Sequence, residues 1–123
     1  MANTQSGWDA AFYADAAGNK PVKDFLDELE QTDPDQVDMI YGKFEIFGAR
    51  GWENSIGSGL LKHIEEKIFE IKVKGRQARV LGFGWQKLFI AAAAEIKKKD
   101  DLDPETITAA KQRREDWIGR YGT

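Results

Sequence analysis

Lysine and arginine side chains gather in residues 60–99 of this 123-residue chain. That stretch carries 10 basic and 4 acidic residues, whereas residues 1–59 carry 4 basic and 11 acidic ones. A cluster of such cations can hold a phosphodiester and stabilise the charge that builds in its transition state. The candidate members are Lys62, Lys72, Lys74, Arg76, Arg79, Lys97, Lys98 and Lys99. The pattern is what a polyanion-binding protein needs, but it equally suits lysines that merely solvate a sheet and protect its edges, so both interpretations stay open on composition alone.

Metal-free cleavage of RNA needs little beyond such a cluster. The 2′-OH of the RNA attacks the adjacent phosphorus, and side chains supply charge stabilisation and proton transfer. The chain has no cysteine and a single histidine, which excludes thiol chemistry and argues against a zinc site of His and Cys. We therefore expect no metal and no other cofactor.

Three weaker signals are better explained by structure than by chemistry. Residues 57–59 followed by Lys62 lack the full spacing of a phosphate-binding loop, so a flexible loop is the simpler interpretation. His63 and Glu66 have no evident third metal ligand, and a solvated strand histidine is expected. Glu65 and Glu66 are expected on opposite faces of a strand, which does not favour a paired-carboxylate site.

The basic residues need a sheet to position them. Residues 67–75 alternate, with Phe69, Ile71 and Val73 on one face and Glu70, Lys72 and Lys74 on the other. A period of two predicts a half-buried strand. A turn at Gly75 and Arg76 then leads to an antiparallel strand over 78–85. We expect a third strand from Lys87 to about Ala94, although its alanines alone would also suit a helix.

The rest of the chain is expected to support this sheet as one domain, 1–123. Residues 8–14 predict an outer strand, and helices are expected to begin at Pro21, Pro34 and Pro104, because proline suits the first helical turn. The first two helices should pack as a hairpin. Residues 48–59 are expected to form an unpatterned loop, and the last helix is expected to dock only partly. The fold class is therefore α+β.

Composition and length fit a cytoplasmic protein. No apolar run reaches the ~18 residues of a membrane span, and the first eight residues lack the basic and apolar regions of a signal peptide. We therefore expect no membrane partner.

Three segments in this order resemble the RelE/ParE superfamily of bacterial toxins, and within it the phage-derived HigB-like branch. They are GNKPVKDFLDEL, KIFEIKVKGRQARVLGF and EIKKKDDLDPETITAAKQRRED. The resemblance implies an N-terminal strand and a two-helix hairpin packed on an antiparallel sheet of three or more strands, with a C-terminal helix. It also implies a type II toxin that cleaves mRNA on the ribosome and is neutralised by a helix-turn-helix, HigA-like antitoxin.

The resemblance also assigns residues to the site. Lys72 stands where the family has the arginine of its Glu-Leu-Arg strand, Arg79 matches the arginine of the next strand, and Lys98 belongs to the family's paired lysines. These three are the expected catalytic residues. The expected RNA contacts are Lys62, Lys74, Arg76, Lys97 and Lys99.

Three positions differ from the family pattern. The family's histidine is replaced by Ala94, its phenylalanine by Ile96 and its tyrosine by Ala78. Two groups able to transfer protons are thus absent at the matching positions.

Two other functions are consistent with the same residues. The chain is also similar to the ParE branch, which implies inhibition of DNA gyrase by contact alone. Alternatively, the sheet binds a protein partner and its basic residues only solvate it.

Overall fold

The computed structural model describes residues 6–97 and 101–123, so the predicted residues Lys98 and Lys99 lie outside the described part. Its elements, in chain order, are β1 (Asp9–Phe12), α1 (Pro21–Glu30), α2 (Pro34–Arg50), α3 (Trp52–Gly57), β2 (Leu61–Glu65), β3 (Ile68–Lys72), β4 (Ala78–Trp85), β5 (Leu88–Ile96) and α4 (Pro104–Tyr121). The predicted α+β class is confirmed. None of these helices is long and apolar enough to cross a membrane.

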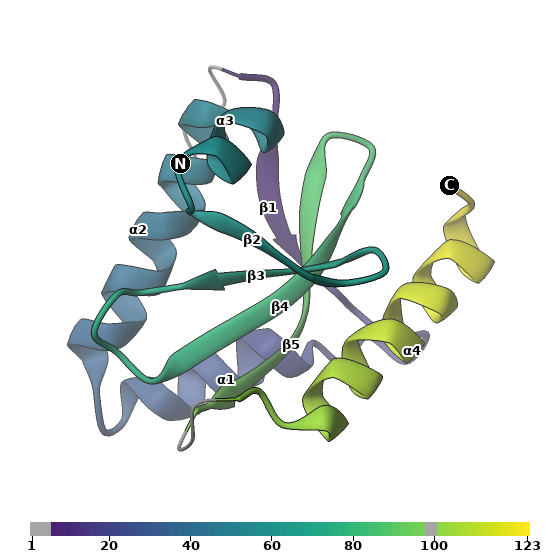
Figure 1. Ribbon diagram of the computed structural model, residues 1–123. Helices are drawn as coiled ribbons and strands as arrows, with labels where there is room; N and C mark the ends of the chain where they lie inside the picture. Colours follow the sequence, from purple (N-terminus) through teal and green to yellow (C-terminus); the bar gives the residue numbers. More distant parts are fainter. Residues whose placement is uncertain (1–5, 98–100) are drawn as a thin grey trace.

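One five-stranded sheet organises the molecule, with strand order β1-β5-β4-β3-β2. The β3–β4 and β4–β5 pairs are antiparallel, as predicted, and β2 adds a further antiparallel pair with β3. Strand β1 runs parallel to β5, so the sheet is mixed. Figure 1 shows α1 and α2 behind the sheet and α4 in front of it. Two hydrophobic clusters fill these two interfaces.

Proline begins three of the helices at the predicted positions. Asp33 precedes Pro34 and accepts a hydrogen bond from the backbone of Gln36 at 3.1 Å. Asp103 precedes Pro104 and accepts one from the backbone of Glu105 at 2.9 Å. Each carboxylate satisfies an N–H that has no partner inside its helix, so the same Asp-Pro pair sets both starts.

The alanine-rich segment is a strand, as predicted, because its position overrides its helical propensity. β5 lies between β1 and β4, and both of its faces are covered, so Ala91, Ala92 and Ala93 are all buried. The register with β4 shifts there, since Leu81 faces Ala93 while the next residue of β4 faces Ala91. Ala92 is therefore a bulged residue. Its carbonyl oxygen accepts a hydrogen bond from Arg113 of α4 at 2.8 Å.

Two predictions about the supporting elements are wrong. Residues 52–57 of the expected loop form α3, because the half-buried Trp52 ring packs edge-on against Phe69 with centroids 4.8 Å apart. Helix α4 also docks along its length instead of partly. Near its end, the Tyr13 hydroxyl donates to Asp116 at 2.6 Å, and the Trp85 indole donates to the Gly122 carbonyl at 2.8 Å.

Candidate nucleic-acid interface

Lys72 and Arg79 are direct cross-strand partners on β3 and β4. They lie on the face of the sheet that carries α4, together with the buried Ile68 and Leu81 of the front cluster. On the same β3–β4 ladder, Glu70 is the partner of Leu81. Alternation and register thus bring two of the predicted catalytic residues side by side, as the sequence suggested.

Arg79 is held in place by its own neighbourhood. One terminal nitrogen, Nη1, donates to the Arg76 carbonyl at 2.5 Å and to the Ala78 carbonyl at 3.1 Å. Its Nε lies 3.7 Å from Oε2 of Glu70, and the two side chains are only 13% and 4% exposed. Since these groups fix one side of the guanidinium, its orientation is set before any ligand arrives.

Glu70 is a functional candidate that the sequence analysis missed. Its place on the polar face of the alternating strand predicted a solvated side chain, yet the residue is 3% exposed. The face is covered at this point, and the ion pair with Arg79 offsets part of the cost of burying a carboxylate. One signal was present in the sequence. Ile68 lies two residues before Glu70, and its apolar side chain already indicated that this face is partly buried.

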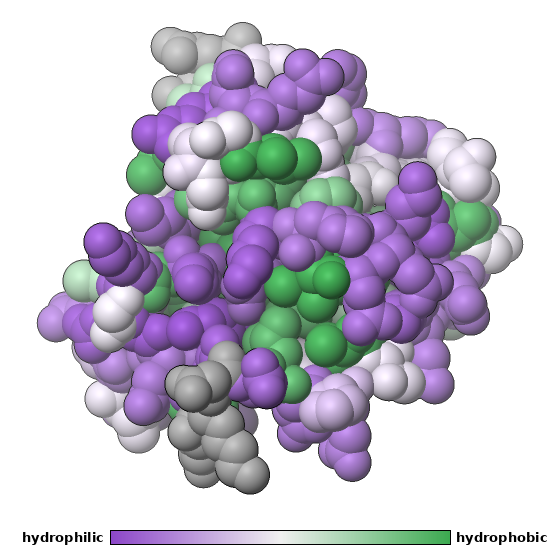
Figure 2. Space-filling view, viewed as in Figure 1, coloured by the Kyte–Doolittle hydropathy of each residue, from purple (hydrophilic) through white to green (hydrophobic). Residues whose placement is uncertain are grey.

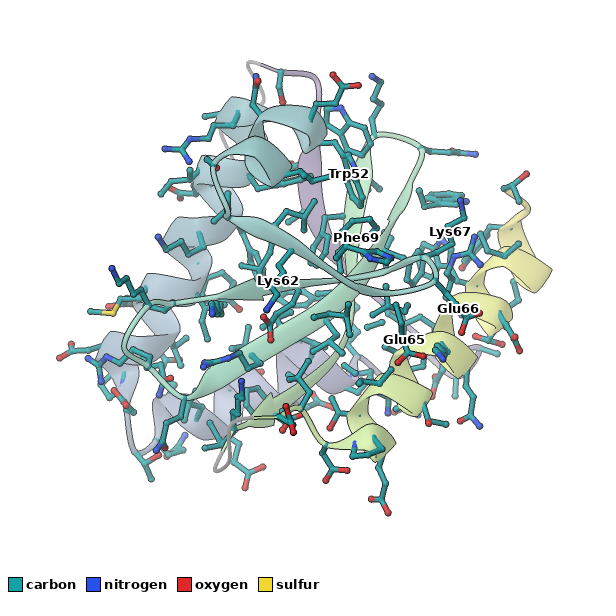
Figure 3. All side chains as sticks on the ribbon, in the orientation of Figure 1. Trp52, Lys62, Glu65, Glu66, Lys67 and Phe69 are labelled. Carbon is teal, nitrogen blue, oxygen red and sulfur yellow. The ribbon has the colours of Figure 1, made fainter. Side chains whose placement is uncertain are left out.

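Lys62 and Lys97 lie at two further points of this face. Lys62 is exposed on β2 and is the register partner of Glu70. Figure 3 shows it projecting from β2 on the side turned to the viewer. Lys97 follows β5, is half-buried, and donates its backbone N–H to the Gln77 carbonyl at 2.7 Å. In the space-filling view, hydrophilic residues flank a hydrophobic strip between the sheet and α4 (Figure 2).

The side chains of Arg76 and Lys74 contact other parts of the molecule than the α4 face. The Arg76 guanidinium lies 3.5 Å from the Asp33 carboxylate, at the start of α2. Lys74 lies in the turn after β3, where it lines a hollow of about 380 Å³ together with Lys72. The cations from the turn therefore point toward the helix hairpin, whereas Lys62 and Arg79 share the α4 face.

Two cations of α2 complete that hollow, and sequence reasoning missed both. Lys43 and Arg50 line it from the helix, together with Ile46 between them. Lys43, Ile46 and Arg50 are spaced three and four residues apart, so the sequence alone could have placed both cations on one helical face. The acidic average of residues 1–59 concealed it, because a regional charge does not say which residues share a face.

The weaker signals have structural roles. His63 is exposed, its ring packs edge-on against Phe69, and its Nε2 lies 2.8 Å from the Glu66 carbonyl oxygen. Within residues 6–97 and 101–123, no three metal-ligating side chains are grouped to hold an ion.

Glu65 and Glu66 do not point apart as predicted. Both contact the Lys111 ammonium of α4, Glu66 at 2.6 Å. Glu66 lies in the turn with a φ of 50°, outside the strand, so strand alternation does not apply to it. Hydrogen bonds to Glu65 and Glu66 raise the pKa of Lys111, and the bond from Lys111 lowers the pKa of Glu66.

The positions that depart from the family pattern lie on the other face. Ala78 is buried in the cluster behind the sheet, and Ala94 and Ile96 pack against that cluster. Side chains at these positions face away from Lys72 and Arg79 in this fold. The arrangement on the α4 face can therefore bind and orient a phosphodiester, while its described carboxylates are engaged: Glu70 is buried, and Glu95 accepts from the Asp103 backbone at 3.0 Å.

No protein-family model matches this sequence, and comparison with curated proteins finds no match.

Proposed function

We propose that this protein is the toxin of a type II toxin–antitoxin system of the RelE/ParE superfamily, HigB-like in type, and that it cleaves mRNA on the ribosome in the cytoplasm. The observation that carries the proposal is the register pair of Lys72 and Arg79 on the partly open α4 face. Two cations at adjacent strand positions can contact one phosphate group together, which scattered surface charges cannot do. The resemblance stated above supplies the rest of the assignment.

In the proposed reaction the protein holds one phosphodiester over this pair. The 2′ oxygen of the RNA forms a new bond to the adjacent phosphorus, and the bond to the 5′ oxygen breaks. The products are a 2′,3′-cyclic phosphate and a 5′-hydroxyl, with the proton of the 2′-OH passing to solvent and another proton reaching the 5′ oxygen. Lys72 and Arg79 stabilise the negative charge that grows on the phosphoryl oxygens. Lys98, a predicted third catalytic residue, lies outside the described part of the chain.

The rate of this reaction follows from the groups that face the substrate. A positioned general acid or base contributes about 10²- to 10⁴-fold in typical enzymes. On the described part of the α4 face, Glu70 is buried against Arg79 and Glu95 is bonded to the Asp103 backbone. Cleavage therefore relies on charge stabilisation and on orientation of the 2′-OH, and we expect it to be slow.

The proposed partner is a small helix-turn-helix antitoxin of the HigA type. An acidic segment of such a protein complements Lys62, Lys72 and Arg79 and blocks access of RNA to them. Expression of this chain alone should then arrest growth, and co-expression of the protein encoded beside it should relieve the arrest.

Primer extension on cellular transcripts tests the proposal. Induction of the wild-type chain should generate new 5′ ends within coding sequences, and Lys72→Ala and Arg79→Lys should remove them. Lys20→Ala serves as the control, because Lys20 is exposed at the start of α1 and lines none of the hollows around the proposed RNA site. Growth without arrest and transcripts without new ends would refute the toxin assignment.

A second function has one observation in its favour. Arg79 is already bonded to two backbone carbonyls and lies against Glu70, which suits a structural cation as well as a phosphate ligand. The same fold would then act by contact alone, as an inhibitor of DNA gyrase or as a protein-binding module. DNA-damage signalling without transcript cleavage selects gyrase inhibition. Partner binding that survives replacement of the basic residues selects the module.

A further inference from the structure

A second cationic surface lies between the end of β3 and α2, and it shares Lys72 with the α4 face. The hollow of about 380 Å³ is lined by Lys43 and Arg50 of α2 and by Lys72 and Lys74 at the end of β3. In the described ranges, none of these four cations lies within 4.0 Å of a carboxylate. Four like charges around one hollow repel one another, and a bound anion would relieve that repulsion.

Arg50 is held in the wall of the hollow by Ser58. The Ser58 hydroxyl accepts a hydrogen bond from Arg50 at 2.9 Å and donates its own proton to the Ser55 carbonyl at 3.2 Å. This bond ties the guanidinium to the segment between α3 and β2, while leaving its other nitrogens without a hydrogen bond to the described residues. Arg50 is therefore oriented across the hollow before a ligand arrives.

A second hollow adjoins the first at Arg50. It measures about 500 Å³ and is lined by Arg50, Trp8, Trp52 and Lys87, with Glu53 as its acidic member. The two indole rings have centroids 5.3 Å apart, and the Lys87 ammonium lies 5.2 Å from the Trp8 ring centroid. Figure 3 shows Trp52 extending from α3 toward the sheet, beside Phe69. Arg50 thus belongs to both hollows, the first lined mainly by cations and the second by two half-buried indoles.

We propose that these two hollows form a path for single-stranded RNA, with phosphates held by Lys43, Arg50 and Lys74 and a base placed against the indole edge of Trp52 or Trp8. This inference rests on the proposed function and deepens it, because Lys72 belongs both to the first hollow and to the Lys72–Arg79 pair. One RNA strand then passes from the α4 face around the end of β3 to α2 and α3. A cationic groove joined to aromatic side chains is the combination that single strands require.

Single-stranded RNA fits these hollows better than an acidic protein segment does. An acidic peptide needs cations alone, whereas the second hollow adds two indole rings and only one carboxylate. A duplex is stiff and presents its bases inward, so it cannot place a base in a recess beside α3.

Fluorescence anisotropy with a 5′-labelled 12-nucleotide single-stranded RNA tests the path. The variant Lys43→Glu/Lys74→Glu changes two side chains that have no hydrogen bond or ion pair among the described residues, so its fold should be kept, which circular dichroism checks. It should bind the RNA at least about 10-fold more weakly than wild type. Its salt dependence should be shallower by about 0.7 in log–log slope for each phosphate that the protein no longer neutralises. The matched control Lys20→Glu changes one charge outside both hollows and should stay within about twofold of wild type once corrected for net charge.

Two further measurements separate this inference from the proposed function. Lys62→Glu alters only the α4 face. If Lys62→Glu weakens RNA binding and Lys43→Glu/Lys74→Glu does not, the path is wrong while the proposed function stands. If wild type binds no RNA, both are wrong. RNA should also change the tryptophan emission, and either Trp52→Phe or Trp8→Phe should abolish that change. If polyglutamate binds as tightly as the RNA does, and RNA leaves the tryptophan emission unchanged, the hollows would be assigned to an acidic protein segment and the RNA path would be wrong.

Discussion

Lys72 and Arg79 stand directly opposite each other on neighbouring antiparallel strands, and Arg79 in turn lies 3.7 Å from the buried carboxylate of Glu70. The exposed lysine and the fixed arginine therefore differ in what they can do. Lys72 is free to move toward a ligand, whereas the guanidinium of Arg79 is held in one orientation by its bonds to neighbouring groups. Their proximity is a property of the strand register, because the side chains of register partners lie about 5 Å apart on one face.

Replacing Glu70 with glutamine should separate the stabilising role of its charge from its effect on ligands. Glu70→Gln removes a negative charge beside Arg79 and should raise RNA affinity severalfold, because the guanidinium loses its competing anion. The free energy of unfolding should fall by about 1–3 kcal/mol, since the buried charge of Arg79 loses its partner. Urea unfolding and anisotropy measure the two effects. An affinity that falls along with stability would contradict this role for Glu70.

The end of α4 should become less firmly docked in acid. Hydrogen bonds from Tyr13 and then Arg120 lower the pKa of Asp116 from its usual 3.8, and burial is the largest cause that raises the pKa of Tyr13. A lowered folded-state pKa means that the ionised carboxylate stabilises the fold fully above about pH 4, and that this contribution is lost as the pH falls below 3.8.

The variant Asp116→Asn checks this pH dependence. It should be less stable than wild type at pH 7, with a gap that narrows at pH 3, as measured by urea unfolding at both values. Tyr13→Phe removes the same hydrogen bond while keeping the titratable carboxylate of Asp116, and serves as a comparison. A gap between wild type and Asp116→Asn that is equal at both pH values would contradict the assignment.

Gly82 should tolerate no side chain. A Cβ built there would lie 2.2 Å from the Ile90 carbonyl oxygen and 2.6 Å from the Phe89 ring, next to the bulge in β5. Gly82→Ala should therefore destabilise the protein by about 1–3 kcal/mol through overpacking. Gly42→Ala is the matched control, because no atom lies within 4 Å of its added Cβ in α2. That control should stabilise the helix by about 0.5–1 kcal/mol. Equal unfolding midpoints for the two variants would count against the described packing.

Local patterns in the sequence predicted the elements that local chemistry determines. The alternating pattern predicted the strand that ends at Lys72, and the turn at Gly75 predicted the antiparallel strand after it. The Asp-Pro pairs predicted where α2 and α4 begin. The parallel pairing of β1 with β5 was not predictable in this way, because it joins segments about 80 residues apart without a local signal.

The unpredicted parts of the site have a similar cause. The burial of Glu70 depends on its position on β3, between β2 and β4, and on Arg79 beside it. The hollow at Lys43 and Arg50 depends on how α2 packs beside the end of β3. Both follow from tertiary packing, so a strand pattern or a regional charge count could not indicate them.

The proposed function requires that the Lys72–Arg79 pair hold an RNA backbone during attack by the 2′-OH. Incubation of the purified protein with a short single-stranded RNA, followed by analysis of the product ends, measures this. We expect slow formation of 2′,3′-cyclic phosphate and 5′-hydroxyl ends, prevented by one 2′-deoxy substitution at the cleaved position and reduced at least about 10-fold by Lys72→Ala. Intact RNA, or cleavage that survives both the 2′-deoxy substitution and Lys72→Ala, would contradict the proposed function.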